Sequence, residues 1–171
     1  MYIQIKKLAT FVPTNFTITN MKIEDVIRSN VKLENSKKVV LNIIYTQNVI
    51  NDSFVEILKP YDLSGEQYNV LRILRGQKGC PANMFLIQER MLAKTSNTTR
   101  LVDKLLLKEL VTREVCPENR RKIEVKITQK GLDALSALDP KVNAHEEKFA
   151  KNLTSDELEQ LNILLEKLRQ Q

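Results

Sequence analysis

Residues 96–127 change their hydrophobic repeat once, and this change constrains the fold more than any other feature of the chain. Over residues 96–107 the apolar residues recur at intervals of three and four, which indicates an amphipathic helix. Over residues 122–127 charged and apolar residues alternate, which indicates a strand with one face in water. A β-type run at 110–115 and a turn at 116–121 come between them. The sequence therefore predicts a helix that leads directly into a two-stranded hairpin.

Capping signals and a proline define two helices upstream. Apolar residues at helical spacing predict a long helix over residues 39–58, which ends at Pro60. Ser64 and Gln67 have the spacing of a capping box, in which each side chain binds a backbone N–H that the helix leaves free. A second helix therefore begins at Ser64, and two nearby glycines end it.

Two short helices follow in close succession, over residues 84–91 and 96–107. A short polar link through Lys94 and Thr95 separates them, and such a pair is typical of a helix-turn-helix. The predicted order up to residue 128 is thus four helices and a hairpin. No internal repeat or flexible linker interrupts it.

Two further helices complete the chain. Thr128 is placed to cap the first, and Pro140 inside it should kink or break it. Thr154 and Glu157 form a capping box for the last helix. The sequence therefore predicts a fold that is mainly α with a small β-hairpin.

The basic residues are concentrated in the middle of the chain. The chain has 27 Lys and Arg against 21 Asp and Glu, a net charge of +6. Residues 83–131 hold eleven basic and six acidic residues, whereas residues 132–171 hold five basic and eight acidic ones. A basic middle and an acidic end indicate a segment that faces a polyanion, joined to a part with a different role.

The predicted helix at 96–107 has a polar face whose chemistry suits the major groove of DNA. Its apolar stripe points inward, and short hydroxyl, amide and basic groups occupy the other side, where Arg can read guanine and Asn adenine. The hairpin turn adds three consecutive positive charges, which suit a minor groove. The expected DNA contacts are Thr95, Ser96, Asn97, Thr99, Arg100, Lys104, Arg120, Arg121 and Lys122. The alternatives are an ordinary solvated helix face and a solvated turn.

Four motifs in this region resemble the multiple antibiotic resistance regulator (MarR) family. They are Thr99-Arg100-Leu101-Val102-Asp103-Lys104-Leu105, Leu110-Val111-Thr112-Arg113, Asn119-Arg120-Arg121 and Val125-Lys126-Ile127-Thr128-Gln129-Lys130-Gly131. The resemblance extends from about Val39 to the C-terminus. It implies a winged helix-turn-helix in each subunit, with N- and C-terminal helices interleaved into a dimer that often binds a small aromatic or phenolic effector near the junction. It also implies that Arg121 enters the minor groove and that Arg120 contacts the adjacent phosphates.

Two positions depart from the family pattern. The usual Asp of the wing is Asn119, which removes a carboxylate that could brace the neighbouring arginine. The usual Gly after the recognition helix is Glu109. This residue must either avoid a left-handed conformation or tolerate it at a cost of about 1 kcal/mol. Neither change removes a basic group that is expected to contact DNA.

These observations divide the chain into four expected segments. They are an N-terminal extension (1–35), an N-terminal dimerisation helix (36–62), a winged helix-turn-helix DNA-binding domain (63–128) and C-terminal dimerisation helices (129–171). The terminal helices carry more apolar surface than a chain of 171 residues can bury alone, so we expect an obligate homodimer. The expected function is that of a ligand-responsive repressor, a sequence-specific regulator of transcription that binds an inverted-repeat operator.

The sequence does not indicate an enzyme, a metal site or a cofactor. It has no Gly-rich phosphate loop, no nucleophile with a paired histidine and no cleft-like cluster of carboxylates. The only histidine, His145, has no second histidine or cysteine nearby, which favours packing over metal binding or sensing. No apolar run reaches the length of a membrane span, and we expect a cytoplasmic protein.

Two alternative functions stay open. The first is a winged-helix module that binds another protein and has lost DNA binding. The second is a thiol-based redox regulator that uses Cys116, because the nearby Arg113 would lower the pKa of a thiol. Cys80 is also present, and we expect both thiols to be reduced.

Overall fold

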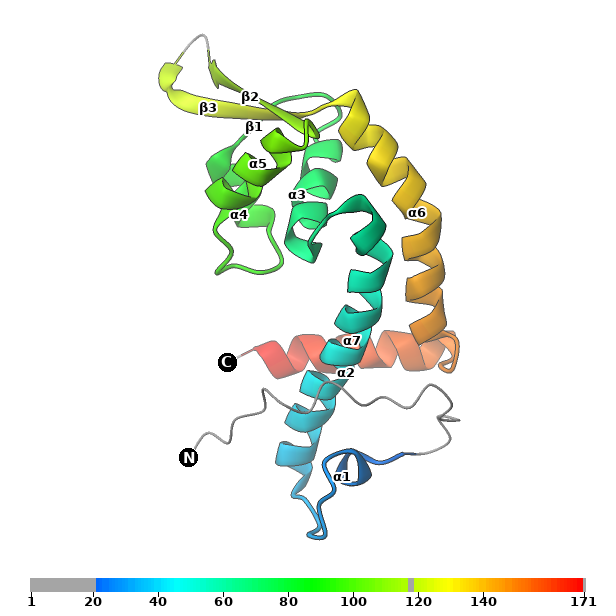
Figure 1. Ribbon diagram of the computed structural model, residues 1–171. Coiled ribbons are helices and arrows are strands. Elements are labelled where there is room, and N and C mark those ends of the chain that lie inside the picture. Colours follow the sequence, from blue (N-terminus) through cyan, green and yellow to red (C-terminus); the bar gives the residue numbers. More distant parts are fainter. Residues whose placement is uncertain (1–20, 117–118, 171) are drawn as a thin grey trace. The chain divides into compact units, whose positions relative to one another are not determined.

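The computed structural model describes residues 21–116 and 119–170 (Figure 1). The chain forms two units, Met1–Gln47 and Asn48–Gln171, and their boundary lies inside helix α2 (Asn35–Leu58). Among the described residues, no helix is long and apolar enough to span a membrane.

The described part of the first unit contains α1 (Ile23–Val26) and the beginning of α2. Helix α1 falls within the expected N-terminal extension, and no sequence signal predicted it. Helix α2 begins four residues before the predicted start, and it ends at Leu58 as predicted.

The second unit holds a short 3-10 helix η1, five α-helices and a three-stranded sheet. They are η1 (Lys59–Tyr61), α3 (Gly65–Arg75), β1 (Ala82–Asn83), α4 (Met84–Arg90), α5 (Thr98–Leu107), β2 (Val111–Cys116), β3 (Asn119–Ile127), α6 (Gln129–Ala150) and α7 (Ser155–Arg169). The sheet is antiparallel in the order β1-β3-β2. In Figure 1 the β2–β3 hairpin projects from the group formed by α3, α4 and α5. This arrangement confirms the mainly helical fold with a β-hairpin, and β1 is an addition to it.

Local capping explains where most of these helices begin. Both predicted capping boxes are confirmed: the Ser64 side chain accepts from the Gln67 N–H, and the Thr154 side chain accepts from the Glu157 N–H. Thr128 caps α6 by accepting from the Gly131 N–H. Helix α5 begins two residues later than predicted.

Two chain breaks differ from those expected. Of the kink or break expected at Pro140, the break does not occur, because α6 continues through the proline as a single element. Leu138 and Val142 on either side of the proline are buried in the core, and their packing offsets the lost backbone hydrogen bond. The expected turn at 116–121 is also too long, because β3 already begins at Asn119.

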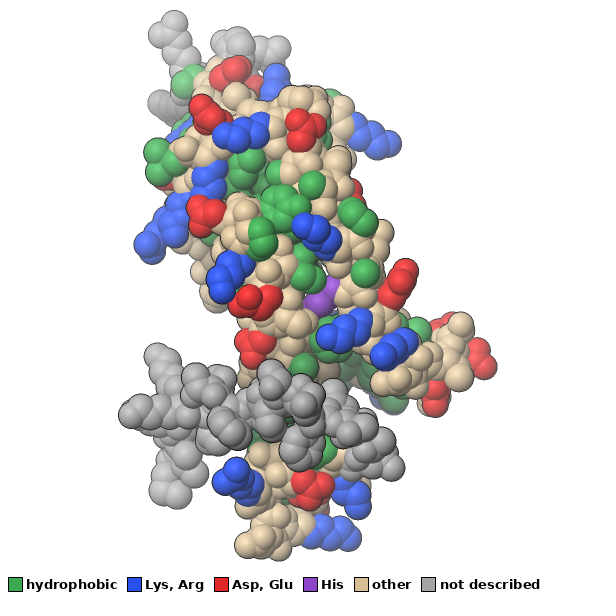
Figure 2. Space-filling view, turned by 45° about the vertical axis from the view of Figure 1, so that its right-hand side comes forward, with side chains coloured by type: hydrophobic (Ala, Val, Ile, Leu, Met, Phe, Trp, Pro, Cys, Tyr) green, Lys and Arg blue, Asp and Glu red, His purple; other side chains and the backbone are tan. Residues whose placement is uncertain are grey.

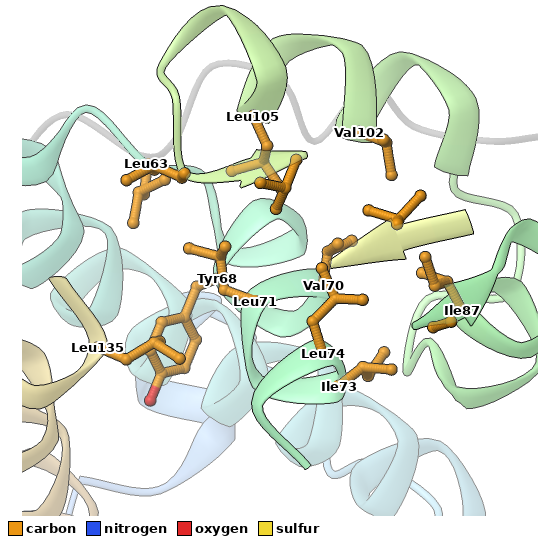
Figure 3. Packing of buried hydrophobic residues seen from close by; sticks show 14 of the residues in the cluster. Leu63, Tyr68, Val70, Leu71, Ile73, Leu74, Ile87, Val102, Leu105 and Leu135 are labelled. Carbon is orange, nitrogen blue, oxygen red and sulfur yellow. The ribbon is translucent and has the colours of Figure 1, made fainter. Parts of the chain in front are cut away.

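One hydrophobic core holds the second unit together. Figure 3 shows Val102 and Leu105 of α5 facing Val70, Leu71 and Leu74 of α3. The buried members are Leu58, Leu63, Tyr68, Val70, Leu71, Ile73, Leu74, Ala82, Ile87, Met91, Val102, Leu105, Leu110, Val111, Val125, Leu135, Leu138 and Val142. The core therefore fixes the orientation of α5 from behind.

The start of α6 lies very close to the sheet. A Cβ added to Gly131 would lie 2.3 Å from the Leu110 backbone oxygen and 2.7 Å from Ile127 Cγ1. Only glycine allows this approach, which accounts for the Lys-Gly pair at the end of the last motif.

The terminal helices differ from this core because their apolar side chains reach the surface. Among the described residues, α7 has no buried side chain. The exposed apolar residues of α2 and α7 are Val39, Val40, Ile43, Ile44, Tyr45, Val49, Ile50, Val55, Leu161, Ile163, Leu164 and Leu168. Hydrophobic side chains are visible among the charged ones on the face shown in Figure 2. These helices leave an apolar surface for a partner to cover.

Candidate nucleic-acid interface

Side-chain amides from α4 and α3 hold the turn between α4 and α5. Gln88 Nε2 donates to the Lys94 carbonyl over 2.8 Å, and the Thr98 hydroxyl donates to Gln88 Oε1. On the α3 side, the Leu92 N–H donates to Asn69 Oδ1 over 3.0 Å. These bonds satisfy the turn's polar groups, so the turn presents α5 in one orientation.

Helix α5 has the two faces that the sequence predicted. Thr98, Val102 and Leu105 are buried, whereas Thr99, Arg100 and Lys104 are exposed. Because a helix repeats every 3.6 residues, positions 100 and 104 lie on one face. The exposed face therefore carries two positive charges and a hydroxyl, backed by a rigid core.

Three further candidate residues lie at or before the start of α5. Thr95 is exposed in the turn and Ser96 is half-buried. Asn97 is the N-cap, and its Oδ1 accepts from the Arg100 N–H over 3.0 Å. Bidentate contact with adenine would need both this oxygen and the amide nitrogen. In this arrangement the Asn97 oxygen already accepts one hydrogen bond, which leaves the nitrogen as the freer of its two groups.

Ion pairs tie both ends of the interface to the fold. Arg113 of β2 pairs with Asp103 of α5, with an N–O distance of 2.8 Å. Lys108, the C-cap of α5, pairs with Asp62 Oδ2 over 2.9 Å. The carboxylate of Asp103, on the exposed side of α5, thus binds the strand that leads to the hairpin.

The wing places its basic residues in strand β3 rather than in the turn. Val115 of β2 pairs with Ile123 of β3, but the next residue of β2, Cys116, pairs with Asn119. The residues of β3 between these two pairs, Arg120, Arg121 and Lys122, therefore lie in an irregular part of the strand. The side chains of Cys116 and of residues 119–122 lie outside the described residues, and so does the turn at 117–118. The expected roles of Arg120, Arg121, Lys122 and Cys116 therefore stay predictions.

Glu109 adopts the left-handed conformation that its position requires, with φ of 60°. Its carboxylate accepts from Lys130 over 2.7 Å, and this hydrogen bond lowers the pKa of Glu109. The Thr128 hydroxyl donates to the Glu109 carbonyl over 2.8 Å. The chain thus tolerates the absence of glycine and supports Glu109 with two contacts to the start of α6.

The same unit contains two polar contacts between helices behind the interface. Arg75 of α3 makes a bidentate pair with Asp139 of α6, with distances of 2.7 and 3.0 Å, which lowers the pKa of Asp139 and raises that of Arg75. His145 is buried between Phe54 and Phe149 and lies 2.6 Å from the Ser53 hydroxyl. It is the purple patch in Figure 2. This position is consistent with the packing role.

Comparisons with known proteins agree with this geometry. The MarR family model matches residues 63–123. The multiple antibiotic resistance protein MarR of Salmonella typhimurium is 31% identical over 129 residues, which are 74% of this chain and 88% of that protein. The chain belongs to the MarR family. This membership confirms the resemblance drawn from the motifs around α5 and the wing.

Solved MarR structures share the fold. A MarR transcription factor from Planctomyces limnophilus has a TM-score of 0.62 and 32% identity, covering 80% of this chain and 98% of that one. The C80S mutant MarR from E. coli complexed with operator DNA has a TM-score of 0.68 and 26% identity, covering 81% and 99%. The winged helix-turn-helix architecture of this chain is therefore confirmed.

Sequence reasoning missed the residues that position the MarR helix-turn-helix. Gln88 and Asn69 are polar residues on amphipathic helices, and nothing in their local sequence indicates a contact with a turn many residues away. The Lys108–Asp62 pair joins residues 46 positions apart. Such contacts depend on the tertiary fold, and one sequence carries no periodic signal for them.

Proposed function

We propose that this chain is a sequence-specific DNA-binding regulator of transcription, a ligand-responsive repressor that binds an inverted-repeat operator as a homodimer. The observation that carries the proposal is α5: its Thr99, Arg100 and Lys104 are exposed, while its opposite face is locked into the core. A fixed helix with a basic face, followed directly by a hairpin, is the arrangement that reads a major groove and an adjacent groove together.

The proposed DNA contacts are divided by chemistry. Arg100 reads guanine, and Asn97 contributes its free amide nitrogen to a base edge. Lys104, Thr95, Ser96 and Thr99 bind phosphates. By the family match, Arg121 enters the minor groove, with Arg120 and Lys122 at phosphates beside it.

The terminal segments have the second proposed role, which is dimerisation. Residues 36–62 and 129–171 form the dimer, and residues 63–128 bind DNA. The exposed apolar residues of α2 and α7 support this division, because they would be covered in a dimer. A two-fold dimer places two copies of α5 on two half-sites, which matches an inverted repeat.

The effector of the proposed repressor is a small aromatic or phenolic molecule, as is usual in the family. A panel of simple phenols and benzoates should release operator DNA from the parent. Release by none of these compounds would contradict a phenolic or benzoate effector.

The test begins with selection of an operator from a random DNA pool, followed by affinity measurement at fixed salt. Arg100→Ala should cost about 1–3 kcal/mol on the selected operator and much less on random duplex. Arg72→Ala, which removes the same charge from an exposed position on α3, is the matched control and should bind like the parent.

Each outcome separates one function from another. Equal losses on operator and random DNA would make Arg100 a phosphate anchor. Absence of any salt-dependent DNA binding would favour the protein-interaction module, because neutralisation of phosphates predicts a steep fall in affinity with salt. Selection of an inverted repeat would support two-fold binding.

A further inference from the structure

The described N-terminal residues form a compact turn that precedes the dimerisation helix. We call residues 21–34 the N-terminal hook. Its helix α1 has only four residues, a length that is not stable in isolation. The Lys22 N–H donates to Asp25 Oδ2 over 3.0 Å at its start, and the Ser29 N–H donates to the Glu24 carbonyl over 2.9 Å at its end. Arg28, with φ of 53°, provides the left-handed residue that this end requires.

Two contacts hold the hook in place within the first unit. Ile23 is buried, with 4% of its surface exposed. Glu24 Oε1 lies 2.9 Å from Lys38 Nζ on the first turn of α2, and the hydrogen bond from Lys38 lowers the pKa of Glu24. The other carboxylate oxygen of Glu24 is buried and accepts no hydrogen bond from the described residues. The hook is thus fixed to α2 and keeps one acceptor open.

The hook and the start of α2 expose most of their large apolar residues. Among residues 21–47 only Ile23 is buried. The exposed apolar residues are Met21, Ile27, Val31, Val39, Val40, Ile43, Ile44 and Tyr45. Val31 is the most exposed of them, at 72%. Residues 21–47, with one buried apolar residue and eight exposed ones, thus present an apolar surface that a further segment could cover.

We propose that the N-terminal hook is part of the dimer interface and is covered by a second copy of this chain. The proposal rests on the proposed homodimer and extends its interface to a segment outside residues 63–123, which match the family model. The exposed apolar residues of the hook belong to the same unit as those at the start of α2, the helix assigned to dimerisation.

Charge favours a second copy over other occupants. Residues 21–47 hold five basic and three acidic residues, whereas α7 holds four acidic and two basic ones. A second copy therefore offers an acidic helix with exposed leucines to a basic unit with exposed apolar residues. The hook and the start of α2 would meet that helix with exposed apolar residues and with charges of the opposite sign.

Photo-crosslinking of the full chain tests the proposal directly. Photoreactive benzoylphenylalanine replaces Val31 in one variant, Leu161 of α7 in a second and Leu92 in a third. Position 161 reports the proposed dimer itself, and Leu92 is the control because it is 87% exposed in the α4–α5 turn. At low micromolar concentration, positions 31 and 161 should give a covalent species of twice the chain mass, and position 92 should not.

The other outcomes overturn the proposal in distinguishable ways. A covalent dimer from position 161 alone would reject the hook and keep the homodimer. No covalent dimer from either position would reject both. A cross-link from position 31 to residues 1–20 or to another part of its own chain, identified by mass spectrometry, would reject the second copy as the occupant. Equal yields from all three positions would also reject it, since they indicate random collision.

A charge exchange tests Glu24 and Lys38 as the positioning pair. Glu24→Lys should weaken the dimer about fivefold or more and lower the cross-link yield at position 31. Adding Lys38→Glu should restore both. Glu34→Lys makes the same charge change at an exposed site in the hook and is the matched control. Unchanged dimer affinity and cross-link yield in Glu24→Lys would overturn this role, provided that the helical circular dichroism matches the parent.

Discussion

The winged-helix part and the terminal helices of this MarR-family chain use similar apolar residues in opposite ways. Val102 and Leu105 of α5 are completely buried within one chain, whereas Leu161 and Leu164 of α7 are 43% and 54% exposed. Both helices have apolar residues at helical spacing. The difference teaches that the same periodicity predicts a helix in both places but identifies its partner in neither. One stripe packs inside the chain, and the other stays exposed within it.

The largest effect is expected from a substitution in the winged-helix core. Leu105→Ala removes a fully buried side chain that α5 places against α3, and it should lower the free energy of unfolding by about 2–5 kcal/mol. Urea denaturation at two chain concentrations measures it. The loss should be the same at both concentrations, and a loss below about 1 kcal/mol would show that the site does not belong to a packed core.

The next effect addresses the terminal helices. Leu164→Asp places a charge in the proposed interface and should weaken the dimer by about 2 kcal/mol, close to thirtyfold. Analytical ultracentrifugation measures the dissociation constant. Glu159→Asp, on the same helix, keeps the charge and should leave the constant unchanged. If Leu164→Asp dimerised as the parent does, α7 would not be part of the interface.

A smaller effect concerns the ion pair between Arg75 of α3 and Asp139 of α6. Arg75 holds the pKa of Asp139 below its ordinary value, mainly through their hydrogen bonds. Stabilisation by this pair is therefore present above the unfolded pKa of about 4 and lost as the pH falls through the folded value. Because both side chains are about one-third exposed, solvent screening limits it to about 1 kcal/mol.

The measurement for this pair is the urea midpoint at neutral pH and near pH 3. Asp139→Asn should be less stable than the parent at neutral pH, and the gap should narrow at the acidic pH. Glu24, Glu109 and Glu157 also have lowered pKa values, so the variant should still lose stability in acid. A gap that stays constant with pH would contradict an ionic role for Asp139.

The smallest effect tests the left-handed residue after α5. Glu109→Gly removes the conformational cost and loses only an exposed ion pair with Lys130, so it should stabilise the chain by about 0.5 kcal/mol. Lys130→Ala, which removes the pair alone, should destabilise it slightly. Thermal unfolding of both variants decides between them, and destabilisation by Glu109→Gly would show that the pair outweighs the backbone cost.

Local signals predicted the helices well because their causes lie within a few residues. The Ser64–Gln67 and Thr154–Glu157 boxes are confirmed at the positions expected from spacing alone. Features with distant causes were missed or misplaced. Strand β1 exists because Ala82 and Asn83 pair with β3, and α6 passes Pro140 because the core holds both sides of it.

The same division applies to the candidate interface. The sequence placed Arg100 and Lys104 on the exposed face of a helix, because periodicity determines which residues share a face. It could not show that the Asn97 oxygen would be used as an N-cap or that Asp103 would bind Arg113. Those competing contacts depend on where the helix begins and on how the hairpin packs.

Light scattering of the parent chain across the micromolar range tests the central claim most directly. The account holds that the apolar faces of α2 and α7 are covered by a second copy. It predicts a particle of twice the 19.8 kDa chain mass that loses its fold as dilution separates the copies. A folded monomer that is stable at micromolar concentration would contradict it.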